Sequence, residues 1–122
     1  MKKVLLVEDD LAIQCVLNYF LKNLGLEVVM FENGYDAWNY WNSQKDIDLI
    51  VTDIMMPKIG GIELAKLIVS NENGKNVPII AVSATNKENY SEEEMENFLV
   101  FLEKPFTKSQ FMDTINDILI LI

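Results

Sequence analysis

The stretch Val4-Leu5-Leu6-Val7-Glu8-Asp9-Asp10 runs from four apolar residues directly into three acids. Similar short apolar runs recur along the chain, at residues 28–31, 49–52, 77–82 and 100–102. Short and nearly continuous apolar runs are typical of strands that are buried on both faces of a sheet. The sequence therefore predicts five buried strands, with acids at the carboxyl end of the first.

Longer segments with helical spacing separate these runs. Residues 11–24 carry apolar side chains at steps of three and four, which predicts an amphipathic helix: Ile13, Val16, Leu17, Phe20 and Leu24. Asp10 is placed to cap the start of this helix, and Gly25 is placed to end it. Four further helices are expected, beginning near Gly34, following Gly61, covering residues 86–97 and following Thr107.

Strands that alternate with helices imply crossover connections and a parallel sheet with helices on both faces. The predicted fold class is therefore α/β, a doubly wound sheet of five parallel strands with five helices. Ligands of such sheets bind beyond the carboxyl ends of the strands. The polar residues that directly follow predicted strands are Glu8, Asp9 and Asp10, then Asp53, then Ser83 and Thr85, and finally Lys104.

This group of carboxylates, hydroxyls and one ammonium has a chemical interpretation. Packed carboxylates raise each other's pKa, and a bound divalent cation relieves their repulsion. Oxygen ligands without His or Cys favour Mg²⁺, with Mn²⁺ as a substitute. A carboxylate can attack phosphorus to form an aspartyl phosphate, and a metal ion with a lysine would stabilise the charge on the phosphoryl oxygens.

Four runs stand in order at the ends of predicted strands: Val4-Leu5-Leu6-Val7-Glu8-Asp9-Asp10, Thr52-Asp53-Ile54-Met55-Met56-Pro57, Ala81-Val82-Ser83-Ala84 and Lys104-Pro105-Phe106. Together they resemble the receiver domains of response regulators, such as the chemotaxis receivers, and the resemblance covers the whole chain. It implies a flavodoxin-like sheet with strand order 2-1-3-4-5. It also implies one receiver domain over residues 1–122, with no output domain among them.

The resemblance implies a role for each matching position. Asp53 resembles the phosphoacceptor, Asp9 a direct metal ligand, and Glu8 an acidic neighbour that acts through water. Asp53 and the backbone carbonyl of Met55 would also ligate the metal. Lys104 resembles the lysine that pairs with the phosphoryl group, and the Lys104–Pro105 bond is expected to be cis.

The remaining matching positions concern the conformational switch and the lifetime of the phosphoryl group. Ser83 resembles the switch hydroxyl, and Phe101 the aromatic switch whose ring turns inward when that hydroxyl moves toward the phosphate. Met55 and Thr85 occupy positions that tune hydrolysis of the phosphoryl group. Such a domain is a signalling switch rather than an enzyme, although it catalyses its own phosphoryl transfer and slow aspartyl-phosphate hydrolysis. Its donor would be a phosphohistidine on a histidine kinase or a histidine phosphotransfer protein, docked on the first helix.

Two other functions compete with this one. A pseudo-receiver would bind partners without phosphorylation, but Asp9, Asp53 and Lys104 are all present, which argues against it. A phosphohydrolase resembling the haloacid dehalogenases would need a second aspartate two positions after Asp53, where Met55 stands.

Composition narrows the possible partners and sites. The chain has 122 residues, a net charge of −9, ten lysines and neither arginine nor histidine. Direct nucleic-acid binding is therefore not expected, and Ser-His-Asp catalysis or a histidine-based zinc site is excluded. Without arginine, the charged pairs that dimerise DNA-binding regulators through the fourth helix, fifth strand and fifth helix cannot form, so we expect a monomer or weak dimer.

Two further expectations concern the surroundings of the protein. No apolar stretch is long enough for insertion into a membrane. The single cysteine, Cys15, lies in an apolar stretch and is expected to be a buried, inert thiol. The absence of any possible internal disulfide predicts a reducing, cytoplasmic location.

Overall fold

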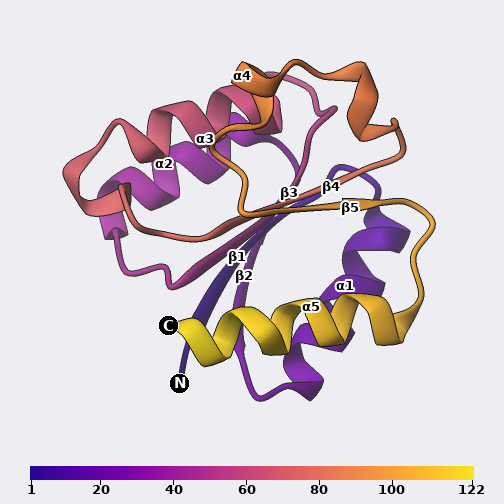
Figure 1. Ribbon diagram of the computed structural model, residues 1–122. Helices are drawn as coiled ribbons and strands as arrows, with labels where there is room; N and C mark the ends of the chain where they lie inside the picture. Colours follow the sequence, from indigo (N-terminus) through magenta and orange to yellow (C-terminus); the bar gives the residue numbers. More distant parts are fainter.

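A five-stranded sheet lies between two layers of helices in the computed structural model, which describes residues 1–122 (Figure 1). The strands are β1 (Lys3–Val7), β2 (Glu27–Phe31), β3 (Leu49–Asp53), β4 (Ile79–Ser83) and β5 (Val100–Glu103). All neighbouring strands pair in parallel, in the order β2-β1-β3-β4-β5. The predicted α/β class and strand order are confirmed.

The helices are divided between the two faces of the sheet (Figure 1). Helices α1 (Leu11–Asn23) and α5 (Lys108–Leu121) cover one face, while α2 (Gly34–Gln44) and α3 (Gly61–Val69) cover the other. The short α4 (Glu92–Met95) lies on the side of α3, and two 3₁₀ turns, η1 (Glu72–Gly74) and η2 (Lys87–Asn89), complete the elements. None of the helices has the length and apolar character needed to cross a bilayer.

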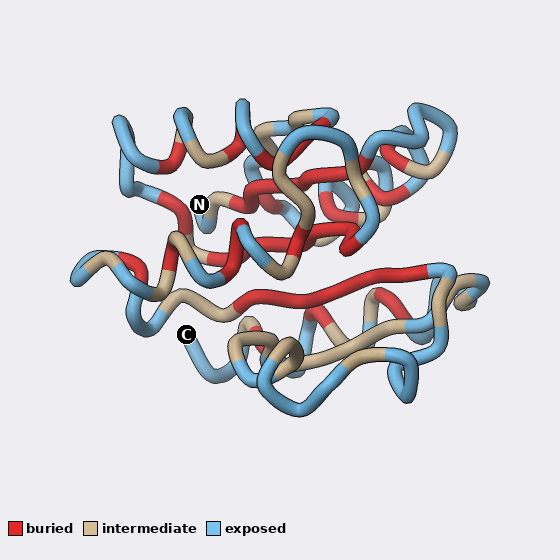
Figure 2. The backbone as a smooth tube through the Cα atoms, turned by 90° about the horizontal axis from the view of Figure 1, so that it is seen from above, coloured by how far each residue is buried: buried red, intermediate tan, exposed pale blue.

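The central strands are buried on both faces, as Figure 2 shows by their red colour. Leu6 and Val51 pack beneath α1 and α5, whereas Leu5 and Ile50 face α2 and α3. Full burial of such a side chain stabilises the fold by roughly 1.5–3 kcal/mol. Two apolar layers on opposite faces explain why these strands read as continuous apolar runs.

Helix α1 begins and ends as predicted, but its buried face differs. Asp10 Oδ1 accepts hydrogen bonds from the backbone N–H groups of Ala12 and Ile13, at 3.0 and 3.1 Å. Gly25 follows the helix with a φ of 79°, in the left-handed region that favours glycine. The sheet-facing positions are Gln14, Leu17 and Leu21.

Two predictions about side chains of α1 are therefore wrong. Val16 is 48% exposed rather than part of the buried stripe, and Cys15 is exposed rather than a buried thiol. The physical reason is the helical turn. When Gln14, Leu17 and Leu21 face the sheet, the two positions after Gln14 point outward.

The helix predicted over residues 86–97 is largely absent, because only the four residues of α4 and the turn η2 form there. Side chains interrupt the helix: Asn86 Oδ1 accepts from the N–H of Glu88, and Ser91 Oγ accepts from the N–H of Glu94. Each bond starts a new short turn. No residue of α4 is buried, so tertiary packing does not extend the helix.

Candidate active site

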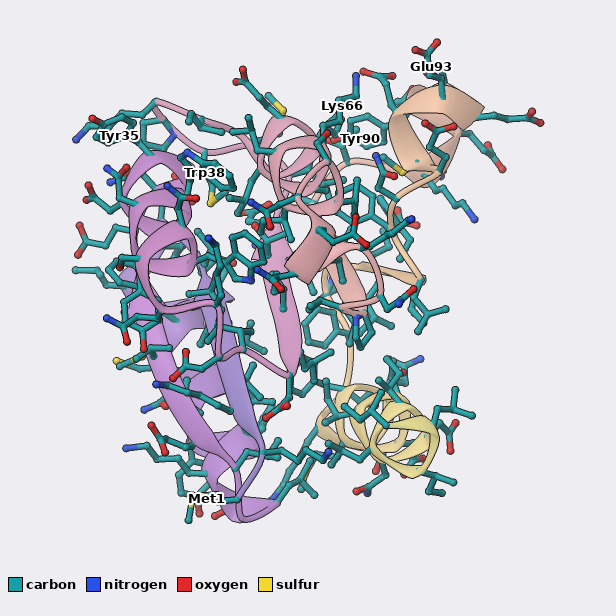
Figure 3. The ribbon with its side chains drawn as sticks, turned by 90° about the vertical axis from the view of Figure 1, so that its left-hand side faces the viewer. Met1, Tyr35, Trp38, Lys66, Tyr90 and Glu93 are labelled. Carbon is teal, nitrogen blue, oxygen red and sulfur yellow. The ribbon has the colours of Figure 1, made fainter.

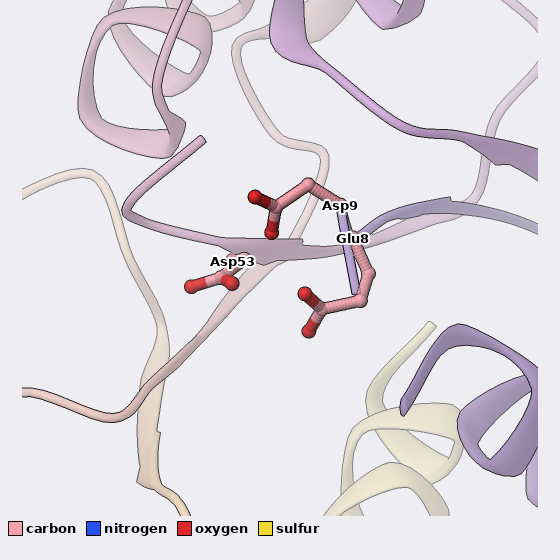
Figure 4. A group of neighbouring side chains, drawn as sticks. All are labelled: Glu8, Asp9 and Asp53. Atoms are coloured by element: carbon pink, nitrogen blue, oxygen red, sulfur yellow. The ribbon is translucent and has the colours of Figure 1, made fainter. Parts of the chain in front are cut away.

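Three carboxylates meet at the carboxyl ends of β1 and β3 (Figure 4). Glu8, Asp9 and Asp53 each offer one oxygen, and these oxygens all lie within 4.8 Å of one another. Glu8 and Asp53 are buried, at 0% and 6% exposure, whereas Asp9 is exposed. The parallel register brings these strand ends together, since Val7 is paired with Thr52, the residue before Asp53.

Lys104 binds two of these carboxylates from the end of β5. Its Nζ donates to Glu8 Oε1 at 2.7 Å and to Asp53 Oδ2 at 3.2 Å. Its backbone N–H donates to the Ser83 carbonyl at 2.7 Å, which fixes the start of the loop after β5. The Lys104–Pro105 bond is cis, as predicted.

The loop after β3 orients Asp53. Its Oδ1 accepts a hydrogen bond from the N–H of Ile54 at 2.7 Å, and its carbonyl accepts from Thr52 Oγ1 at 2.8 Å. Gly61, the first residue of α3, lies so close that a Cβ there would overlap the Asp53 carbonyl oxygen. The glycine is therefore required by the close approach of α3 to the backbone of Asp53.

Gln14 supports the acidic strand end, a role that the sequence did not reveal. Its side chain is 9% exposed, and Nε2 donates to the carbonyls of Glu8 and Phe31, at 3.2 and 3.3 Å. The Glu8 N–H donates to the same Phe31 carbonyl at 3.0 Å. The only sequence signal was a polar residue on the sheet-facing side of α1, and recognising it required the correct helical phase.

Burial and charge act in opposite directions on the titration of this cluster. Burial is the main cause that raises the pKa of Glu8 to about 7; the hydrogen bond from Lys104 lowers it and neighbouring Asp53 raises it. For Lys104, burial opposes the charged form, but Glu8 and Asp53 outweigh it and raise the lysine pKa. At neutral pH Lys104 is therefore a cation held between two acids.

Ser83 ends β4 beside this cluster, one residue after Val82, which is paired with Asp53. Ser83 is 1% exposed. Its hydroxyl oxygen accepts a hydrogen bond from the Thr85 N–H at 3.0 Å and lies 3.3 Å from the Tyr90 hydroxyl. Phe101, on β5, is half-buried with its ring 6.1 Å from that of Tyr90. The Met55 side chain lies outside the cluster and is 67% exposed.

The donor set of the cluster suits a hard cation. It consists of carboxylate oxygens alone, two of them from buried residues, without nitrogen or sulfur ligands. Such sets bind Mg²⁺ in preference to softer metals, and Asp9 gives the site an open side toward solvent. One ammonium against three carboxylates leaves a net negative charge that a divalent ion would neutralise.

Comparison with known proteins agrees with this geometry. Residues 4–116 match the family model of the response regulator receiver domain. A curated relative, the two-component response regulator-like PRR37 of Oryza sativa subsp. indica, is 38% identical over 85 residues, covering 69% of this chain and 12% of the relative. This chain thus spans about an eighth of the length of that relative.

Two solved structures share the fold closely. The receiver domain of sensor histidine kinase PA1611 from Pseudomonas aeruginosa PAO1, with magnesium in its active site cleft, has a TM-score of 0.85, 29% identity and 95% coverage of both chains. Response regulator TrrA of Thermotoga maritima, in complex with Mg²⁺ and BeF, has a TM-score of 0.85 and 28% identity, covering 96% of this chain and 98% of its own.

Proposed function

Since the chain belongs to the response regulator receiver domain family of two-component systems, we propose that Asp53 accepts a phosphoryl group from a phosphohistidine on a histidine kinase or histidine phosphotransfer protein. The observation that carries the proposal is the position of Lys104. Its ammonium binds both Glu8 and Asp53. The buried Asp53 carboxylate therefore contacts a cation on one side and lies beside the carboxylates of Glu8 and Asp9.

Asp9, Asp53 and the backbone carbonyl of Met55 would hold Mg²⁺, with Glu8 contributing through water. The direct ion pair of Glu8 with Lys104 at 2.7 Å supports an indirect role for Glu8. The cation would supply charge neutralisation on the phosphoryl oxygens. The magnesium bound by the PA1611 receiver supports the choice of metal.

In the transfer, a carboxylate oxygen of Asp53 forms a bond to phosphorus while the bond from phosphorus to the donor imidazole breaks. The hydrogen bond from the Ile54 N–H holds the Asp53 carboxylate in place during attack. Lys104 would stay with the transferred group by pairing with one of its oxygens. Ser83 would donate its hydroxyl to another, and the resulting shift would reach Phe101.

An apolar groove beside the site supports docking of the donor on α1. The groove encloses about 350 Å³ and its lining includes Ile13, Val16 and Phe20 from α1 with Pro105 and Phe106 from the loop after β5. Lys104 borders it, so a helix seated there would bring its histidine toward Asp53. The half-exposed Val16 belongs to this surface.

Chemical mapping tests the proposal. The protein is incubated with acetyl phosphate and Mg²⁺ and then reduced with borohydride, which converts an aspartyl phosphate to homoserine. Trypsin releases a peptide, residues 46–58, that contains Asp46, Asp48 and Asp53. We expect homoserine at position 53 alone. Homoserine at Asp46 or Asp48, or none in a folded protein with bound Mg²⁺, would contradict the proposal.

A further inference from the structure

The Ser83 hydroxyl is bonded to other groups than the Asp53 carboxylate, whose phosphoryl group it is expected to bind. The acceptor oxygens of Asp53 are occupied by the Ile54 N–H and by Lys104, and Ser83 makes no hydrogen bond to them. The Ser83 oxygen instead accepts from the Thr85 N–H and contacts the Tyr90 hydroxyl at 3.3 Å. Tyr90 is the only side chain that hydrogen-bonds Ser83.

Tyr90 links Ser83 to two other parts of the molecule. Its ring lies 6.1 Å from the Phe101 ring, at an angle of 54°. It also directly precedes Ser91, the N-cap of α4, whose capping box with Glu94 is complete. A change in the position of Tyr90 would therefore act on both Phe101 and the start of α4.

There is space for such a change. Tyr90 borders an open groove of about 510 Å³ toward α3, which is lined by Ile54, Met55, Ile62 and Lys66 among others. Figure 3 shows Tyr90 between α3, which carries Lys66, and α4, which carries Glu93. The ring can leave Ser83 without displacing a packed core residue.

We infer that Tyr90 is a positioning residue that holds the Ser83 hydroxyl in its resting orientation, so that capture of a phosphoryl group requires the Ser83–Tyr90 hydrogen bond to break. The inference rests on the proposed function. In the parent, binding of a phosphoryl group costs the Ser83–Tyr90 hydrogen bond, and this loss weakens binding. Removal of the Tyr90 hydroxyl therefore strengthens binding of a phosphoryl mimic. Release of Tyr90 from Ser83 then changes its packing against Phe101 and the position of the start of α4.

The test uses Tyr90→Phe, which keeps the ring and removes the hydroxyl. Beryllium fluoride is titrated into the full chain at saturating Mg²⁺, and its affinity is measured by calorimetry. We expect the affinity to rise about two- to tenfold, the effect of one net hydrogen bond. The rise should vanish when Tyr90→Phe is made in a Ser83→Ala background, because the two residues act as a pair.

Tyr35→Phe is the matched control, since Tyr35 is exposed on α2 and forms no side-chain hydrogen bond with Ser83. In the protein without beryllium fluoride, Tyr90→Phe should shift the amide resonance of Thr85, which donates to Ser83, and Tyr35→Phe should not. An unchanged or weakened affinity in Tyr90→Phe, an unmoved Thr85 resonance, or an effect that persists in Ser83→Ala would overturn the inference alone. A parent chain that binds no beryllium fluoride would contradict the proposed function and the inference together.

Discussion

Glu8 is fully buried with one cationic partner, and this sets a pH dependence that is specific to one residue. Its pKa rises from 4.5 to about 7, mainly through burial. In that interval the folded protein binds more protons than the unfolded chain. The contribution of Glu8 to stability is therefore complete below about pH 4.5 and is lost as pH rises through about 7.

We predict that, in EDTA, the free energy of unfolding of the parent falls relative to Glu8→Gln as pH rises from about 4.5 to about 8, by on the order of 2 kcal/mol. Urea unfolding at a series of pH values measures the difference. Because every other acid is shared, the comparison reports the titration of Glu8 together with its partners Asp53 and Lys104. A parent and a Glu8→Gln variant with parallel pH profiles would show that burial does not govern this carboxyl.

Met55 offers a second test at the level of one residue. Its exposed thioether follows the proposed phosphoacceptor by two positions and cannot orient a water by strong hydrogen bonding. We predict that Met55→Asn shortens the lifetime of the phosphorylated protein about two- to tenfold, the effect of one hydrogen bond to the attacking water. Loss of the adduct is followed by intact mass after the phosphodonor is removed. Equal or faster decay in the parent would contradict the prediction.

The neighbouring acids Asp9 and Asp10 have different roles, one in the carboxylate cluster and one at the start of α1. Asp10 caps α1, whereas Asp9 belongs to the carboxylate cluster. Asp10→Asn should therefore keep both the cap and phosphorylation, and Asp10→Ala should cost about 1 kcal/mol of stability. Asp9→Asn should keep the fold but weaken Mg²⁺ binding at least tenfold, because one charged ligand is lost.

Calorimetric titration with Mg²⁺ and urea unfolding of the same three variants measure both roles. The assignment would be reversed if Asp10→Asn lost Mg²⁺ binding as severely as Asp9→Asn. It would also be wrong if Asp10→Ala left the stability of α1 unchanged.

How far the sequence predicts each element depends on whether its structure is decided locally. The strands and the residues that end them were predictable, because burial on both faces leaves continuous apolar runs and the acids follow directly. The caps of α1 were predictable because they depend on local residues, the Asp10 side chain and the left-handed conformation of Gly25. The segment over residues 86–97 was not, since Asn86 and Ser91 form turns that compete with helix while no apolar face is buried.

Two contacts between distant elements, those of Gln14 and Tyr90, could not be predicted from the sequence. The bond from Gln14 to the Glu8 carbonyl depends on the rotation of α1 about its axis, which placed Val16 outward against expectation. The contact of Tyr90 with Ser83 depends on the path of an irregular segment. Neither Gln14 nor Tyr90 belongs to a motif, so their contacts could be identified only from the tertiary structure.

The absence of arginine bears on how the protein associates with itself. Elements α4, β5 and α5 carry six acids, a single lysine (Lys108) and no guanidinium, so bidentate pairs with carboxylates cannot form across their surface. We predict that the protein stays monomeric or weakly dimeric both with and without Mg²⁺ and beryllium fluoride. Sedimentation velocity checks this, and a tight dimer formed only with beryllium fluoride, with this face buried, would contradict it.

The proposed phosphorylation of Asp53 with Mg²⁺ underlies every other functional prediction. Intact-mass measurement after incubation with acetyl phosphate checks it, for the parent and Asp53→Asn, each with Mg²⁺ and with EDTA. We expect a single phosphoryl adduct on the parent with Mg²⁺ and none under the other three conditions. An adduct of equal yield on Asp53→Asn, or no adduct on a folded parent that demonstrably binds Mg²⁺, would contradict it.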